Sequence, residues 1–153
     1  MCVGGIGRIY SAYFFVLMRW LVSEILIIDD CQIICNVIAG ALDVDGISCT
    51  SSNSGIEAMS LISKNNYSTI FLDVNLPDSD SVDIAAFIRK KSLLTQIVVI
   101  SGDMNDDVFY QFINFGVNDF FHKNMLSITD IGKTVKFGAW RQERLASLFS
   151  EIK

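Results

Sequence analysis

In the stretch "IFLDVNLPDSDS", residues 70–81, an apolar run ends on a carboxylate, Asp73. A short run of β-branched and apolar residues bounded by turn residues predicts a strand that is buried on both faces. Pro77, the only proline of the chain, follows four residues later and predicts a loop. The stretch therefore predicts a buried strand, a loop that begins at an acidic side chain, and a helix from residue 81.

The same alternation of short β-rich runs and longer periodic segments continues along the chain. Strands are predicted at 24–29, 47–51, 69–74, 96–101 and 118–122. Helices are predicted at 31–42, 55–64, 81–91, 106–115 and 128–148. This alternation is typical of an α/β fold, here a doubly wound parallel sheet of five strands with helices on both faces. The runs at 69–74 and 96–101 are the most continuously apolar, so we expect them to be central strands.

Length and composition limit the classes of protein to which the chain can belong. The chain has 153 residues, of which 51% are apolar, and this predicts a single domain with one core. Its net charge of −5 offers no positive surface to a phosphate backbone, so direct nucleic-acid binding is disfavoured. The four cysteines lack the spacing of a metal site and are typical of reduced thiols in a cytoplasmic protein.

Residues 9–22, "IYSAYFFVLMRWLV", are almost wholly apolar and precede the first predicted strand. A transmembrane helix needs about 20 apolar residues. Arg19 interrupts this run, so we expect no membrane span, and the residues after it make a poor signal-peptide cleavage site. Met18 lies just before the predicted domain, which leaves two explanations open. Residues 1–22 are an apolar N-terminal extension, or the first 17 of them result from an upstream start codon.

Polar side chains stand at the ends of four predicted strands: Asp29 and Asp30 after the first, Asp73 at the third, Ser101 at the fourth and Lys123 after the fifth. The carboxyl ends of parallel strands meet at one edge of a sheet, so we expect these side chains to form one site. Clustered carboxylates repel one another and require a cation, and oxygen-only ligands favour Mg²⁺. The pattern predicts that Asp73 attacks phosphorus while the lysine and the serine hold the other phosphoryl oxygens.

Over about residues 23–142 the sequence resembles the receiver domains of two-component response regulators. Four motifs carry the resemblance: "ILIIDD" (25–30), "FLDVNLPDSDS" (71–81), "VVISGD" (98–103) and "GVNDFFHKN" (116–124). The resemblance implies a flavodoxin-like (βα)5 receiver fold. It also implies a role for seven residues: Asp73 as the phosphoacceptor, Asp29, Asp30, Asp73 and the backbone carbonyl of Asn75 as Mg²⁺ ligands, Ser101 as the switch hydroxyl, Phe120 as the switch aromatic, and Lys123 as the basic partner of the phosphoryl group.

The resemblance further implies a function like that of the single-domain chemotaxis regulators. A sensor histidine kinase or a phosphotransfer protein would supply the phosphoryl group to Asp73. The protein would then signal to a downstream protein target, or associate with itself, through its last two helices. It would be no enzyme, apart from catalysing its own Mg²⁺-dependent phosphorylation and dephosphorylation, and it would be cytoplasmic with no membrane or nucleic-acid partner.

Two departures from the family pattern keep an alternative open. Asn124 stands where the family usually has a proline after a cis peptide bond. A non-proline cis bond costs about 2.5–4 kcal/mol, so a trans bond is expected here. Ser81 stands where the family commonly has glycine. The alternative function is therefore a pseudo-receiver, an interaction module that works without phosphorylation.

Two other classes with a similar strand pattern fit less well. Phosphatases that use an aspartate nucleophile need a second acid two residues further on, and Asn75 occupies that position. A flavin-binding module needs a hydroxyl- and glycine-rich phosphate loop after the first strand, where this chain has "DDCQIICN".

Residues 143–153 follow the receiver pattern and are expected to continue its last helix. Leu145, Leu148, Phe149 and Ile152 recur at helical spacing and predict an amphipathic extension. About ten residues are too few for an effector domain within this sequence. The predicted organisation is an extension at 1–22, a receiver domain at 23–142 and a helical extension at 143–153. Whether the chain is a natural single-domain regulator or a truncated longer one stays open.

Overall fold

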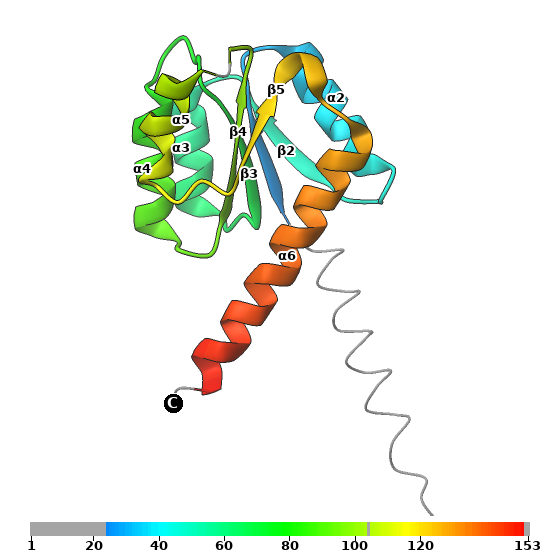
Figure 1. The fold of residues 1–153 in the computed structure, drawn as a ribbon, viewed down its shortest axis with the longest axis vertical. Helices are drawn as coiled ribbons and strands as arrows, with labels where there is room; N and C mark the ends of the chain where they lie inside the picture. The colour runs from blue at the N-terminus through cyan, green and yellow to red at the C-terminus, as the bar shows by residue number, and fades with distance from the viewer. Residues whose placement is uncertain (1–23, 104, 152–153) are drawn as a thin grey trace, which may run out of the picture.

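The computed structural model describes residues 24–103 and 105–151, so the predicted extension at 1–22 lies outside the described residues (Figure 1). Five parallel strands form one sheet in the order β2-β1-β3-β4-β5. The strands are β1 (Ile25–Ile28), β2 (Cys49–Ser52), β3 (Thr69–Asp73), β4 (Gln96–Ser101) and β5 (Asp119–His122). The helices are α2 (Gln32–Asp43), α3 (Gly55–Lys64), α4 (Ser81–Lys91), α5 (Asp106–Ile113), α6 (Ile128–Glu151) and the short 3-10 helix η1 (Lys123–Met125). The doubly wound flavodoxin-like fold is confirmed.

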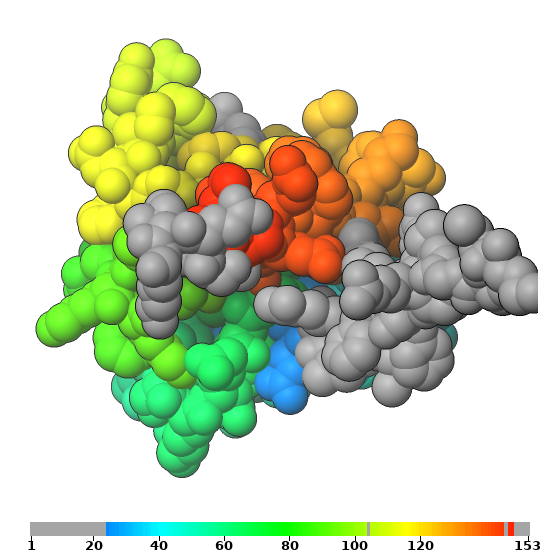
Figure 2. All heavy atoms as spheres, turned by 90° about the horizontal axis from the view of Figure 1, so that it is seen from below, coloured from blue at the N-terminus to red at the C-terminus, as the bar shows by residue number. Residues whose placement is uncertain are grey.

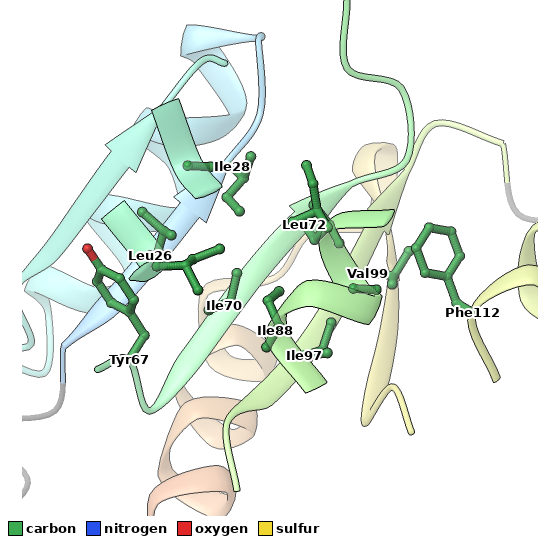
Figure 3. Packing of buried hydrophobic residues seen from close by; sticks show 13 residues of the cluster. Leu26, Ile28, Tyr67, Ile70, Leu72, Ile88, Ile97, Val99 and Phe112 are labelled. Atoms are coloured by element: carbon green, nitrogen blue, oxygen red, sulfur yellow. The ribbon is translucent and has the colours of Figure 1, made fainter. Parts of the chain in front are cut away.

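Helices cover both faces of the sheet, with α3, α4 and α5 on one side and α2 and α6 on the other (Figure 1). Successive side chains of a strand point to opposite faces. In β3, Ile70 and Leu72 therefore pack under α3 and α4, while Phe71 packs under α2 and α6. Figure 3 shows the first of these two clusters, in which Val99 of β4 and Phe112 of α5 also take part. Because both faces are covered, the middle of an inner strand is apolar on both faces, and its polar residues are confined to the ends.

The positions of the strands in the sheet match their hydrophobicity. The two strands predicted to be central, β3 and β4, are both inner strands, and so is the wholly apolar β1. The strand β2, with the polar sequence CTSS, lies at one edge. The strand β5 forms the other edge and is half-buried along its length. Val74, which follows β3, donates its N–H to the Ile100 carbonyl of β4, so the end of β3 is fixed beside the end of β4.

The helix α6 continues into the predicted extension as far as Glu151, and it reaches across the amino-terminal edge of the sheet. Gln142 fixes it there, because its Nε2 donates to the carbonyls of Ser68 (2.6 Å) and Leu94 (2.7 Å), which precede β3 and β4. Gly138 is buried against the side chain of Gln96, and a Cβ at this position would overlap the Gln96 amide. Seen from below, α6 occupies the middle of this edge (Figure 2).

The predicted C-terminal stripe is only partly described. Residues 143–151 continue α6 as a helix, in which Leu145 is half-buried and Leu148 is exposed. The side chain of Phe149 and the whole of Ile152 lie outside the described part of the chain. No helix in residues 24–103 or 105–151 combines the length and the apolar character that crossing a bilayer requires.

Gly55 lets the loop after β3 approach the start of α3 closely. A Cβ on Gly55 would lie 2.5 Å from the Cβ of Ser79 in that loop and 2.8 Å from Ile84 of α4. Atoms at such distances overlap, so a larger residue must displace the loop or the helix. The absence of a side chain at this position therefore allows α3, the loop and α4 to pack together.

We predict that Gly55→Ala lowers the free energy of unfolding by about 1–3 kcal/mol, because the new methyl group overpacks this contact. Urea denaturation followed by circular dichroism measures the change. Gly40→Ala is the matched control, since Gly40 is also helical and has open space around it. The control should raise the free energy of unfolding by about 0.5–1 kcal/mol through its helix propensity. Equal stabilisation by both substitutions would contradict the packing at Gly55.

Candidate functional site: an acidic cluster with one lysine

Three aspartates meet at the carboxyl-terminal edge of the sheet. Asp29 directly follows β1 and Asp73 ends β3, and the register pairs Ile28 with Leu72, which brings these two acids side by side. One carboxylate oxygen from each of Asp29, Asp30 and Asp73 lies within 4.8 Å of the others. Asp29 and Asp73 are buried and Asp30 is exposed. The site is thus open to solvent on the side of Asp30.

Lys123, which follows β5, balances the charge of the two buried acids. Its Nζ lies 2.9 Å from Asp29 Oδ2 and 2.9 Å from Asp73 Oδ2, and it donates a hydrogen bond to Asp29 Oδ1 at 3.1 Å. Burial works against the charge of this ammonium, but its hydrogen bonds to Asp73 and Asp29 outweigh burial and raise the pKa of Lys123. The lysine therefore stays protonated and bridges β1 and β3.

The environment of Asp73 makes the charged form of its carboxyl group less favourable. Burial raises the pKa of its carboxyl above the ordinary value, and repulsion from Asp29 acts in the same direction. The hydrogen bond from Lys123 and the N–H of Asn75, which donates to Asp73 Oδ1 at 3.3 Å, oppose this shift without cancelling it. A desolvated carboxylate of this kind is a better nucleophile than one that is fully hydrated.

The cluster also fits a hard divalent cation. All of its candidate ligands are carboxylate oxygens, the ligand type that Mg²⁺ and Ca²⁺ prefer. Asp29 Oδ2 is buried, and the ammonium of Lys123 pairs with it at 2.9 Å. A carboxylate oxygen has two lone pairs, so an ion pair on one side leaves the other for a metal ion. The acidic cluster can therefore bind a metal.

The loop after Asp73 is held by its own backbone and by Ser81. The Ser81 hydroxyl, buried at the start of α4, donates to the Asp73 carbonyl at 2.5 Å and also lies 3.0 Å from the Val74 carbonyl. Asn75 and Asp80 form an isolated antiparallel bridge across the loop. Ser81 thus fills the usual glycine position without a positive φ, and its side chain fixes the backbone on which Asp73 stands.

Asp78 ties the same loop to the amino terminus of α3. It accepts hydrogen bonds from Ser54 Oγ (2.6 Å), from the N–H of Gly55 (2.9 Å) and from the N–H of Ile56 (3.3 Å). These bonds lower the pKa of Asp78, the Ser54 hydroxyl contributing most. The carboxylate also meets the positive end of the helix dipole. The sequence did not predict that Asp78 binds the start of α3 or that the Ser81 side chain binds the Asp73 carbonyl. Nothing in the local sequence shows how α3 and α4 lie beside the loop.

Ser101 and Phe120 lie near the site but are engaged elsewhere. The Ser101 hydroxyl, buried at the end of β4, donates to the Asp103 carbonyl (2.6 Å) and accepts from the Asp103 N–H (3.0 Å). Phe120, on β5, is half-buried, and its ring centroid lies 5.1 Å from that of Phe109 in α5. The structure therefore brings Asp29, Asp73 and Lys123 into direct contact, with Asp30 close to the two other acids. Ser101 lies on the neighbouring strand β4, and Phe120 lies on β5, two strands from Asp73.

The segment after Lys123 adopts a trans backbone, as expected for Asn124. No cis peptide bond occurs among the described residues. Lys123 instead begins η1, and the N–H of Asn124 donates to His122 Nδ1 at 3.1 Å. With this trans backbone, the ammonium of Lys123 reaches the acidic cluster.

The chain is similar to known proteins in sequence and in fold. The sequence model of the response regulator receiver domain family matches residues 25–136. The sensor histidine kinase RcsC of Escherichia coli is 29% identical over 79 residues, which are 52% of this chain and 8% of RcsC. The chain thus spans under a tenth of the length of that curated relative.

Solved structures share the fold. The CheY-like receiver domain protein from Methanospirillum hungatei JF-1 has a TM-score of 0.75 at 19% identity, covering 80% of this chain and 97% of that one. A response regulator from Burkholderia pseudomallei, solved with a phosphorylated aspartic acid, a calcium ion and citrate, has a TM-score of 0.68 at 18% identity, covering 82% of this chain and 74% of that one.

We predict that Asp73→Asn raises the urea midpoint of unfolding at neutral pH. Because the pKa of Asp73 is raised in the folded state, the folded protein holds this proton more tightly than the unfolded chain does. Stability therefore falls as pH rises from the ordinary Asp value of 3.8 through the raised one. The gain from Asp73→Asn should shrink as pH is lowered through that window.

Asp83→Asn, at an exposed position in α4, is the control and should not raise the midpoint. A lower midpoint for Asp73→Asn at neutral pH would show that the ion pair with Lys123 outweighs the cost of burial.

Proposed function

The chain belongs to the response regulator receiver domain family, and from this premise we propose that it accepts a phosphoryl group on Asp73 and signals through protein contacts. The observation that carries the proposal is the protonated Lys123, held between the buried carboxylates of Asp29 and Asp73 at the open edge of the sheet. The phosphoryl donor is a sensor histidine kinase or a phosphotransfer protein. The proposed unit is residues 23–142, with 143–153 as a helical extension.

In the proposed reaction, a carboxylate oxygen of Asp73 attacks the phosphorus of a phosphohistidine. The new O–P bond forms as the P–N bond breaks, and the leaving electron pair stays on the imidazole nitrogen. Lys123 contacts Asp73 before the reaction and is placed to pair with an oxygen of the new phosphoryl group. Ser81 and Asp78 hold the loop, so that the carboxylate presents the same oxygen to each donor.

Mg²⁺ is the cofactor that we propose. Asp29, Asp30 and Asp73 would hold it together with the backbone carbonyl of Asn75, which follows Asp73 in the same loop. When bound, the ion neutralises the negative charge of the phosphoryl oxygens. It would also reduce the repulsion between the acids, which Lys123 by itself balances only in part.

The proposed output begins at Ser101 and Phe120. A phosphoryl group on Asp73 offers its oxygens to the Ser101 hydroxyl, which would leave the Asp103 loop for them. Moving that loop changes the support of α5, whose Phe109 packs on Phe120. The exposed side chains of α5 and α6, such as Tyr110 and Trp140, would form the surface that a downstream protein or a second copy contacts.

We expect millimolar Mg²⁺ to raise the melting temperature of the protein, because binding to the folded state alone stabilises it. Differential scanning fluorimetry with MgCl₂ against NaCl at matched ionic strength measures the shift. Asp30→Asn should remove most of the shift, whereas Asp130→Asn, which lies in α6 and is equally exposed, should keep it. An equal shift in wild type and Asp30→Asn would overturn the metal site.

Acetyl phosphate with Mg²⁺ should add one phosphoryl group, detected by intact mass and lost on treatment with hydroxylamine. Asp73→Asn should abolish the addition. Lys123→Ala should keep some of it but lose the conformational response, since the ammonium relays the new charge to the last loop. Lys136→Ala is the matched control, because Lys136 pairs with Asp45 away from the site.

Amide chemical shifts of α5 before and after phosphorylation report the response. A protein that adds no phosphoryl group, yet still binds its partners, would be the pseudo-receiver alternative. An unchanged response in Lys123→Ala would contradict the role of the lysine alone.

A further inference from the structure

A cavity of about 360 Å³ lies at the edge of the sheet opposite to Asp73. It is bounded by the first residues of β4 and β5 on one side and by α6 on the other, with Gln96, Asn118 and Asp119 facing Lys133, Phe137 and Arg141. In the view from below, the orange residues of α6 border the yellow residues around β5 (Figure 2). This volume is within the range of small-molecule sites.

The hydrogen-bond acceptors of the cavity are already engaged. Asp119 is the acidic residue of the lining, and its Oδ1 accepts from the N–H of Phe120 at 2.9 Å. Its Oδ2 accepts from the hydroxyl of Thr134 at 3.1 Å, which also uses the hydrogen of that hydroxyl. Asn118 Oδ1 accepts from the N–H of Ile97 at 2.8 Å. A ligand that enters the cavity therefore meets few free acceptors.

The donors of the cavity, in contrast, are unused. Within residues 24–103 and 105–151, no group accepts a hydrogen bond from Asn118 Nδ2 or Gln96 Nε2, although Gln96 is only 3% exposed. Arg141 has no hydrogen bond or ion pair to any described residue, and its Nε is buried. Lys133 adds an exposed ammonium at the rim. Among the described residues, the lining therefore offers more free hydrogen-bond donors than free acceptors, and the Nε of Arg141 is both buried and unpaired.

The side chains that line the cavity carry a net positive charge, which favours the same kind of ligand as the free donors do. Lys133 and Arg141 carry two positive charges against the single negative charge of Asp119. Arg89 lies near enough to repel Arg141, and its own guanidinium is spent on four backbone carbonyls. Burial lowers the pKa of Arg141, as expected for a cation that lacks a partner. An anion would relieve both the desolvation and the repulsion.

We propose that this cavity binds the carboxylate of a small organic acid whose apolar body packs on Phe137. A planar carboxylate matches the fork of a guanidinium and can accept two parallel hydrogen bonds from Arg141. Asn118 and Gln96 supply further donors, and Lys133 supplies the second cation. The site is independent of the phosphorylation that we propose for Asp73, because it lies at the other end of β4 and β5.

The test uses two probes of the same shape and opposite charge, benzoate and benzamidine. Each is titrated into the ¹⁵N-labelled full-length protein at constant ionic strength, and the Nε–Hε signal of Arg141 and the side-chain amide signals of Asn118 and Gln96 are followed. We expect benzoate to shift these signals with saturation at millimolar concentration, as the size of the ligand allows. Benzamidine should leave them unmoved.

Arg141→Gln should weaken the binding of benzoate about tenfold or more, because a charge-assisted hydrogen bond is lost. Arg144→Gln, which removes an exposed arginine one turn further along α6, should bind benzoate as wild type does. Because Arg141 has no partner within the described part of the chain, Arg141→Gln should also melt no lower than Arg144→Gln. Asp73→Asn should keep full benzoate binding.

Three results would overturn the proposal: shifts that do not saturate, equal shifts with benzamidine, or equal weakening by Arg141→Gln and Arg144→Gln. A large loss of stability in Arg141→Gln would likewise show that the arginine serves the fold. The side-chain amide signals in Lys133→Gln, a substitution at the exposed rim, provide a second test if Arg141→Gln does not fold. Unchanged affinity in Lys133→Gln would then remove the electrostatic basis of the site.

Discussion

The ammonium of Lys123 makes the carboxyl edge of this sheet possible. A parallel sheet with two covered faces brings the ends of β1 and β3 into register, and each of these ends carries a buried carboxylate. Two such charges in contact would destabilise the fold unless a cation lay between them. The lysine arrives from the end of β5, 94 residues after Asp29, so the charge balance joins the first strand to the last. The fold must therefore bring the end of β5 close to the ends of β1 and β3, so that the charges of the site balance.

The loop after Asp73 is held by contacts with two helices, which give the proposed nucleophile a fixed backbone. Ser81, at the start of α4, donates to the carbonyl of Asp73. Asp78, within the loop, accepts a hydrogen bond from the start of α3. Gly55 leaves the room that these contacts require. The acid, its loop and two helices thus form one packed unit. The end of β3 is also bonded to β4, through Val74 and Ile100, so Asp73 stands on a backbone that is fixed on several sides.

The fold could be predicted from the sequence because each strand and helix has a strong local signal. The apolar runs of β3 and β4 and the glycines at positions 46 and 116, which take positive φ values, mark the boundaries well. The positions of the acids could be predicted too, since strand ends converge in this topology. The contacts of Asp78 and Ser81 could not, because they depend on the angle at which α3 and α4 pack. The donors around Arg141 come from β4, β5 and α6, and no spacing in the sequence relates them.

Gln142 anchors α6 to the sheet and divides the helix into two arms of unequal length. Its side chain holds the carbonyls of Ser68 and Leu94, and Ser68 itself bonds to the Glu24 carbonyl, so the contact gathers the starts of three strands. Fourteen residues of α6 precede Gln142 and nine follow it, which at about 1.5 Å per residue gives arms of about 21 Å and about 14 Å. The long arm packs in the core through Ile131 and Val135, so this part of α6 is fixed to the sheet at more than one place. The short arm continues past the starts of the strands (Figure 1), and its direction is therefore set by the two hydrogen bonds of Gln142.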